Sequence, residues 1–172
     1  MTFEEIYLEH NNLVFNLALQ YVQNTEDAQE IAQDVFLKVY EKLQTFQEIS
    51  SLKTWIYRIT INTSLDFIKA KKRDKRGFFF SALRIDDPEK NISVPNFDHP
   101  GFLMEDKEAV SQIFAAINRL PEEQKTTILL MRLEDKTQAE TAEIMGKSSK
   151  AIESLYQRAK KNLKTILNEN EG

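Results

Sequence analysis

The 172-residue chain contains no cysteine, which excludes disulfide bonds, thiol nucleophiles and cysteine metal ligands. It is also poor in the residues that build tight turns, with four glycines and four prolines. Sheet architectures need more of both, so their scarcity favours a helical protein. The absence of cysteine also fits a reducing compartment.

Long apolar runs are absent as well. No stretch approaches the roughly 20 apolar residues that span a bilayer. The first residues, Met-Thr-Phe-Glu-Glu, lack the basic start and apolar core of a signal peptide. We therefore expect a cytoplasmic protein that does not insert into a membrane.

Groups that carry enzyme chemistry are few. The two histidines, His10 and His99, are isolated in the sequence, and no glycine-rich phosphate loop is present. Acidic residues are plentiful, but on the expected helices they fall on solvated faces and do not converge. The sequence therefore predicts a protein that is not an enzyme, with no catalytic residue, no metal ligand and no cofactor.

Charge is present in quantity and is unevenly distributed. The net charge of −4 hides a value of −7 for residues 1–50, +7 for residues 51–84, −5 for residues 85–108 and +1 for residues 109–172. Within the last block, residues 147–164 alone carry +5. Two basic segments on an acidic chain indicate two contacts with one polyanion, while the acidic surfaces limit unselective binding.

Apolar residues at helical spacing predict two helices in the first 43 residues. Apolar residues from Phe3 to Tyr21 mark the first, and apolar residues from Ala28 to Leu43 mark the second. Thr25 is the expected N-cap of the second helix, with Glu26 and Asp27 in its first turn. The second helix is amphipathic. Its polar face carries Gln29, Glu30, Gln33, Asp34, Lys38 and Glu41.

A third helix is predicted from about Leu52 to Lys72. One stripe of this helix is mostly apolar and is expected to be buried: Leu52, Trp55, Ile56, Ile59 and Thr63. A polar stripe lies beside it: Arg58, Asn62, Asp66, Lys69 and Arg73. This polar stripe fits a solvated face with an Asp66–Lys69 pair as well as it fits a binding surface.

Residues 77–105 break the helical period and predict a flexible linker. For its aromatic run, Phe78 to Phe80, packing on a neighbouring domain is favoured over the reading of bases. Helical spacing resumes at about Met104, and Pro121 is expected to open a new helix at its first position. The fold class is therefore all-α, with two small helical domains at 1–76 and 106–168 and the linker between them.

Residues 137–164 predict a helix-turn-helix. Thr137 and Glu140 have the spacing of a capping box, and Gly146 suits a left-handed helix end. Ser148 is expected to cap the next helix, whose buried positions are Ile152, Leu155, Ala159 and Leu163. An ordinary helical hairpin is the alternative, but the basic outer face favours DNA binding.

At this point the chain resembles the bacterial RNA polymerase sigma factors of the extracytoplasmic-function (ECF) group. The resemblance covers residues 1–76 (region two) and 106–168 (region four). The stretches that carry it are Asp27–Tyr40, Trp55–Ile59 with Asn62 and Asp66, Leu120–Lys125, Ala139–Gly146 and Ala151–Leu163. Two independent modules in the right order make the resemblance specific.

The resemblance implies roles for region two. The polar face of its second helix would dock on core RNA polymerase through Gln29, Glu30, Gln33, Asp34 and Lys38. The loop 44–51 and the third helix would melt the minus-ten element and read it as single-stranded DNA. The residues expected there are Lys53, Trp55, Tyr57, Arg58, Asn62, Lys69 and Arg73. For Trp55, which lies on the apolar stripe, a core position is favoured over base stacking.

Region four would read the minus-thirty-five element as duplex DNA. The residues expected in that contact are Lys147, Ser148, Ser149, Lys150, Glu153, Ser154, Gln157, Arg158 and Lys161. Three positions depart from the pattern of the family. Ser154 stands where many relatives are basic, Thr141 where many carry isoleucine, and Lys147 where an apolar residue is usual.

The resemblance thus implies a transcription initiation factor whose partners are core RNA polymerase and promoter DNA. An anti-sigma factor is a further partner that many relatives have. The nearest rival is a helix-turn-helix regulator that needs no polymerase, but this interpretation leaves residues 1–76 without a role.

Overall fold

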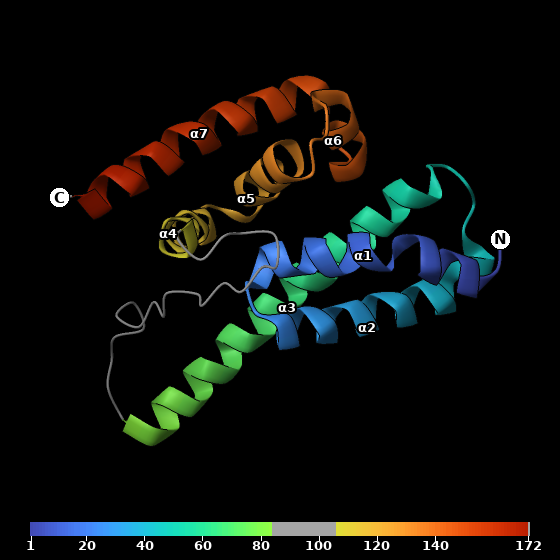
Figure 1. Ribbon diagram of the computed structural model, residues 1–172, viewed down its shortest axis with the longest axis horizontal. Coiled ribbons are helices and arrows are strands. Elements are labelled where there is room, and N and C mark those ends of the chain that lie inside the picture. Colours follow the sequence, from blue (N-terminus) through green and yellow to red (C-terminus); the bar gives the residue numbers. More distant parts are fainter. Residues whose placement is uncertain (84–105, 172) are drawn as a thin grey trace.

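The computed structural model describes residues 1–83 and 106–171, with side chains described for residues 1–77 and 106–170. Within these residues every regular element is a helix (Figure 1). The elements are α1 (Phe3–Val22), α2 (Thr25–Lys42), η1 (Leu43–Thr45), α3 (Leu52–Leu83), α4 (Lys107–Asn118), α5 (Glu122–Ile128), η3 (Leu129–Leu133), α6 (Gln138–Met145) and α7 (Ser149–Glu171).

The N-terminal module consists of α1, α2 and α3, which pack around a shared apolar core (Figure 1). Ile6, Val14, Ile31 and Ile56 lie in this core and are fully buried. The prediction of Thr25 as the N-cap of α2 was wrong. The cap is Asn24, whose side-chain oxygen accepts from the backbone N–H of Asp27 at 2.9 Å, so Thr25 is the first helical residue.

The third helix is longer than its apolar stripe predicted. It begins after Ser51, whose hydroxyl accepts from the backbone N–H of Thr54 at 3.1 Å. It then continues past Lys72 to Leu83, through the first residues of the predicted linker. The lysines and arginines before Gly77 are good helix formers and sustain the helix without an apolar stripe. The side chains of Phe78 to Phe80 lie outside the described residues.

The C-terminal module consists of α4 to α7. Pro121 is the N-cap of α5, one position before the place predicted for it, and the helix passes into the π-helical turn η3. Leu129 and Leu130 of this turn are fully buried. Ile152 and Leu155 of α7 pack with Ala142 of α6 in a second, smaller cluster.

The N-terminal and C-terminal modules pack against each other and share one apolar core. One core cluster contains residues of α1, α2 and α3 together with Ile117 of α4, Ile128 of α5 and Ala159 of α7. Helix α6 also lies against α3. Region-by-region sequence reasoning gave no prediction for this contact. Among the described residues, no helix is long and apolar enough to cross a membrane.

Candidate nucleic-acid interface

The predicted helix-turn-helix forms, and its local signals act as expected. The hydroxyl of Thr137 accepts from the backbone N–H of Glu140 at 3.1 Å, and the carboxylate of Glu140 accepts from the N–H of Thr137 at 2.8 Å. Gly146 ends α6 with φ 64°, a conformation that a side chain would strain. Ser148 caps α7 by accepting from the N–H of Ala151 at 3.1 Å. The turn therefore fixes the angle at which α7 leaves α6.

The outer face of α7 is open to solvent. Ile152, Leu155 and Ala159 are buried as predicted, whereas Leu163, also predicted to be buried, is half-buried. The opposite face exposes Lys150, Glu153, Ser154, Gln157, Arg158 and Lys161. Several of these side chains line a shallow groove with Lys147 and Ser148. The arrangement offers donors and cations along one helix, as major-groove readers do.

Two of the predicted contacts at the start of α7 have partners inside the protein. Lys147 is half-buried and pairs with the carboxylate of Glu123 in α5 at 2.8 Å. The hydroxyl of Ser149 accepts from the side-chain amide of Gln138 at 2.9 Å. These bonds hold the N-terminal end of α7 against α5 and α6.

The polar stripe of α3 is divided between solvent and the C-terminal module. Lys53, Asn62 and Arg73 are exposed. The guanidinium of Arg58 donates to the carbonyl oxygens of Glu143 and Ile144, at 2.5 and 3.1 Å. Lys69 pairs with Glu122 of α5 at 3.1 Å, a partner that the predicted Asp66–Lys69 pair did not include.

Tyr57 of α3 is buried, and its hydroxyl donates to the carboxylate of Glu134 at 2.8 Å. Burial raises the pKa of this phenol, and the negative charge of Glu134 raises it further. Trp55 is half-buried on the apolar stripe, with its ring 4.9 Å from the ring of Phe46. The tryptophan therefore joins α3 to the loop that precedes it.

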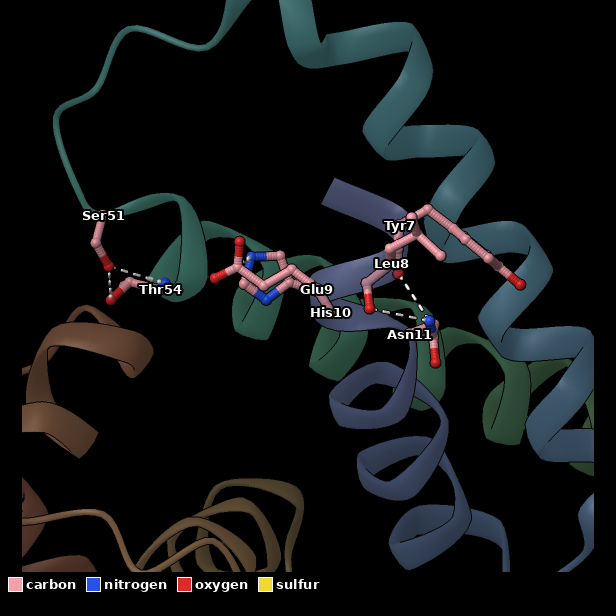
Figure 2. Close-up of polar contacts among 7 residues, drawn as sticks. All are labelled: Tyr7, Leu8, Glu9, His10, Asn11, Ser51 and Thr54. Carbon is pink, nitrogen blue, oxygen red and sulfur yellow. Dashed lines mark hydrogen bonds and ion pairs between the residues drawn. The ribbon is translucent and has the colours of Figure 1, made fainter. Parts of the chain in front are cut away.

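That loop, predicted to receive a base, borders a hollow. The hollow is lined by Phe46, Glu48, Ile49, Ser50, Ser51 and Leu52, together with Glu143 of α6. Figure 2 shows Ser51 at the start of α3, where its hydroxyl contacts the backbone and the hydroxyl of Thr54. Glu48 has φ 53°, a left-handed conformation that non-glycine residues adopt mainly at turns and functional sites.

The polar face of α2 is open as predicted, apart from one residue. Gln29, Glu30, Gln33 and Asp34 are exposed. Lys38 is half-buried and donates to the hydroxyl of Thr63 in α3 at 3.0 Å. The lysine thus contributes to the packing of α2 on α3.

Two exposed apolar side chains on α2 were missed by sequence reasoning. Leu37 is 58% exposed and Tyr40 is 64% exposed, although both belong to large hydrophobic types. The ring of Tyr40 packs edge-on against Phe3 at 5.3 Å. The signal was available, because Leu37 lies one helical turn from Gln33 and Asp34 on the polar face.

The chain thus combines two modules. One is a helix-turn-helix in which the outer face of α7 is exposed, and the other is a helical module with basic and acidic faces. This combination is typical of a two-module DNA-binding protein. The comparisons make this class specific. Two family models match: Sigma-70 region 2 over residues 6–74 and Sigma-70 region 4 over residues 111–163.

Curated relatives align with most of the chain. The RNA polymerase sigma factor SigV of Bacillus subtilis is 28% identical over 159 residues, which cover 92% of this chain and 87% of the relative. The ECF RNA polymerase sigma-E factor of Escherichia coli is 28% identical over 143 residues, covering 83% and 74%. The RNA polymerase sigma-H factor of Pseudomonas aeruginosa is 27% identical over the same length, with the same shares.

Solved structures share the fold across both modules. The sigma factor RpoE of Bartonella quintana, solved with the anti-sigma factor NepR, aligns with a TM-score of 0.65 at 20% identity and covers 96% of each chain. CnrH, solved with the cytosolic domain of CnrY, aligns with a TM-score of 0.66 at 18% identity, covering 97% of this chain and 88% of CnrH.

The chain belongs to the extracytoplasmic-function group of bacterial RNA polymerase sigma factors. It is a transcription initiation factor, which acts with RNA polymerase at promoter DNA. The rival interpretation, a helix-turn-helix regulator without sigma activity, has no support, because the region 2 match occupies residues 6–74. The relatives of this chain are transcription factors.

Proposed function

We propose that the C-terminal module reads the minus-thirty-five element through the outer face of α7. Lys150, Glu153, Ser154 and Gln157 would meet base edges in the major groove. The phosphates would be held by Lys147, Ser148, Arg158 and Lys161, and Ser149 would face the groove at the start of the helix. The proposal is supported by the exposure of this face and by the capped turn that aims it.

The N-terminal module would read the minus-ten element as melted single strand. An unstacked base needs a hollow beside aromatic and amide groups, flanked by cations for the phosphates. The hollow at loop 44–51 supplies the first requirement, with Trp55 and Phe46 beside it. The surrounding contacts are assigned to Lys53, Tyr57, Arg58, Asn62, Lys69 and Arg73.

The outer face of α2 would dock on core RNA polymerase. A polar rim is formed by Gln29, Glu30, Gln33 and Asp34. Lys38 holds α2 against α3 through its hydrogen bond to Thr63. Leu37 and Tyr40 add the exposed apolar area that this rim surrounds. Interfaces concentrate their binding energy in such a centre, where a few apolar anchors lose water inside a polar border.

Two further assignments complete the proposal. The protein would work in the cytoplasm, where its polymerase and promoters are found. It would also be held inactive by an anti-sigma factor, since the solved structures that it resembles are complexes with such partners.

The observation that carries the proposal is that one chain presents three helix faces of different charge. These are an acidic face on α2, a basic stripe on α3 and a basic outer face on α7. Run-off transcription with core polymerase and a promoter library tests it. Transcripts should arise only from promoters that share two elements at fixed spacing. Tight, sequence-specific binding to duplex promoter DNA without polymerase would contradict it.

A further inference from the structure

Methionine is the residue type of this chain that peroxides oxidise most readily, because cysteine, the other sulfur-containing target, is absent. The sequence holds four methionines. Met1 is exposed, and Met104 lies outside the described residues. The other two, Met131 and Met145, both belong to the C-terminal module. A peroxide that reaches this protein therefore meets few sulfur atoms, and two of them lie in the helix-turn-helix module.

Met131 and Met145 pack against the same small apolar cluster. The buried members of this cluster are Ala142, Ile152 and Leu155. Met131 comes from the π-helical turn η3, and Met145 is the last residue of α6, immediately before Gly146. Helix α6 lies against both η3 and α7, and Figure 1 shows it beside the start of α7. The two thioethers therefore help to hold α7 on α6.

The position of these side chains leaves their sulfur atoms reactive. Both methionines are half-buried, so they pack on the cluster and are also reached by solvent. The sulfur of Met145 lies 3.6 Å from the hydroxyl of Thr127 in α5. That hydroxyl has one proton, and the carbonyl oxygen of Glu123, a stronger acceptor than a thioether, lies 2.7 Å away. The sulfur of Met145 thus keeps the lone pairs that a peroxide oxidises.

We propose that Met145, together with Met131, is an oxidation site through which hydrogen peroxide switches off promoter reading by α7. A lone pair of the methionine sulfur attacks one peroxide oxygen, so that an S–O bond forms while the O–O bond breaks. The sulfur loses two electrons and the peroxide gains them. The departing hydroxide takes the proton from the new S–OH group, which leaves a sulfoxide and one water. The inference rests on the proposed reading role of α7.

A sulfoxide is incompatible with the packing at this turn. Its oxygen is a strong hydrogen-bond acceptor, and the aliphatic side chains of Ile152 and Leu155 offer no donor. The hydroxyl of Thr127, which does lie beside the sulfur, is engaged by the carbonyl oxygen of Glu123. The new oxygen must therefore stay unpaired or turn toward water and open the cluster. In both cases α7 loses its fixed angle to α6.

The change is reversible by chemistry that acts on sulfoxides in general. Methionine sulfoxide reductases, one for each sulfoxide epimer, return the thioether. Because oxidation adds no bond between residues, the reduced chain can repack its cluster. The site therefore makes the activity of the chain responsive to peroxide without any cysteine.

The test oxidises this protein alone. The full chain is treated with hydrogen peroxide, freed of oxidant by catalase, and then added to untreated core polymerase. Peptide mass spectrometry should find one added oxygen on Met131 and one on Met145. Run-off transcription from a selected two-element promoter should fall about tenfold, since an unpaired polar group shifts a packing equilibrium by that factor or more. Treatment with both reductases should restore the transcript.

The variant Met131→Leu with Met145→Leu removes both sulfur atoms and keeps apolar side chains of similar volume. It should transcribe like the wild type and keep its activity after peroxide. Met104→Leu is the matched control and should lose activity as the wild type does. An equal loss in the double leucine variant would overturn the assignment to these two residues. Full activity of wild-type protein that carries both sulfoxides would overturn the switch.

A second variant needs no oxidant. Met145→Gln places a polar side chain of similar length at the cluster, so transcription should fall about tenfold, whereas Met145→Leu alone should remain active. Oxidised wild type and Met145→Gln should both keep their affinity for core polymerase, because the proposed docking face on α2 belongs to the other module. Loss of polymerase binding in the same proportion would show general damage and refute a local effect at the turn.

Failure of the proposed reading role has a different signature. If Lys150→Ala selects the same upstream sequence as the wild type, the assignment of α7 fails. The oxidation site fails instead if no sulfoxide forms at Met145 in the folded protein. It also fails if peroxide leaves the urea unfolding of the wild type and of the double leucine variant equally unchanged.

Discussion

The ammonium group of Lys125 in α5 lies 3.1 Å from the carbonyl oxygen of Tyr21 and 5.1 Å from the centre of its ring. The charge is enclosed, since both residues are buried. Burial, helped by the positive charge of Lys72 and opposed by Glu122, lowers the pKa of Lys125 from 10.5 to about 8. The contact between the modules therefore holds a group that titrates at mildly alkaline pH.

This gives a signed prediction for stability. Between pH 8 and pH 10.5 the exposed Lys125 of the unfolded chain keeps a proton that the folded chain releases. The contribution of Lys125 to the free energy of unfolding must then rise with pH through that window, by about 1.5 kcal/mol between roughly pH 8 and pH 9.5. Urea unfolding of the wild type against Lys125→Met measures it, because the variant lacks the titrating group. Equal slopes for both proteins would contradict the assignment.

The buried hydroxyl of Thr141 has no hydrogen-bond partner, although the residue is 0% exposed. Thr141→Val keeps the shape of the side chain and removes the unpaired group, so the free energy of unfolding should rise by about 1 kcal/mol. Thr127→Val is the matched control. Its hydroxyl, in an equally buried residue, donates to the carbonyl oxygen of Glu123 at 2.7 Å, and its loss should not stabilise.

Arg58→Ala and Lys69→Ala should weaken promoter opening more than they weaken binding to core polymerase. The expected loss is about tenfold in open-complex formation, since each side chain is assigned to phosphates of the melted strand. Permanganate reactivity of unpaired thymines measures opening, and co-elution with core polymerase measures binding. Arg132→Ala, at an exposed position of the C-terminal module, is the control and should match the wild type.

Lys150→Ala should relax the preference for the upstream promoter element. A side chain that reads a base edge contributes about 1–3 kcal/mol of discrimination at one position, so the loss should be confined to that position. Selection from a library randomised over the upstream element records it. Lys164→Ala, farther along α7, should leave the selected sequence unchanged. An identical sequence preference for Lys150→Ala would remove this residue from the reading face.

Leu37→Ala and Tyr40→Ala should each reduce affinity for core polymerase about tenfold. Leu37 is mostly exposed, so its removal should change stability by no more than about 0.5 kcal/mol, whereas loss of the Tyr40 ring, which packs on Phe3, should cost about 1 kcal/mol. Fluorescence anisotropy of labelled protein titrated with core polymerase gives the affinity. Leu8→Ala, on α1 with 74% exposure, is the control for loss of exposed apolar area. Unchanged affinity in both test variants would exclude this part of α2 from the interface.

Local signals predicted most of the fold. Thr137, Glu140, Gly146 and Ser148 each act on backbone groups within four residues, so their spacing alone determines the turn. The cap of α2 was misplaced by one residue because Asn24 and Thr25 are adjacent and both are good caps. The end of α3 was misplaced because basic residues sustain a helix without leaving an apolar stripe.

Contacts between modules could not be predicted in this way. Tyr21 fits the apolar stripe of α1, and nothing nearby in sequence indicates that its hydroxyl meets Thr126. Lysine is among the residues that are least often buried, so the sequence alone predicts a solvated Lys125. Its burial depends on partners in α1, which only the folded structure brings close. Arg58 was singled out on the polar stripe, but its docked partners come from residues more than 80 positions away, and no local signal indicates them.

Docking of the two modules also changes how the chain meets bulk DNA. In the docked chain Arg58 and Lys125 donate to carbonyl oxygens and Lys69 pairs with the carboxylate of Glu122, so these cations are engaged inside the protein and contribute less to counterion release when a nucleic acid approaches. Separation would return them to solvent, and the salt dependence of DNA binding should become steeper as phosphates gain these cations. A docked chain would therefore spend less time on random genomic sequence and diffuse more freely until polymerase captures it.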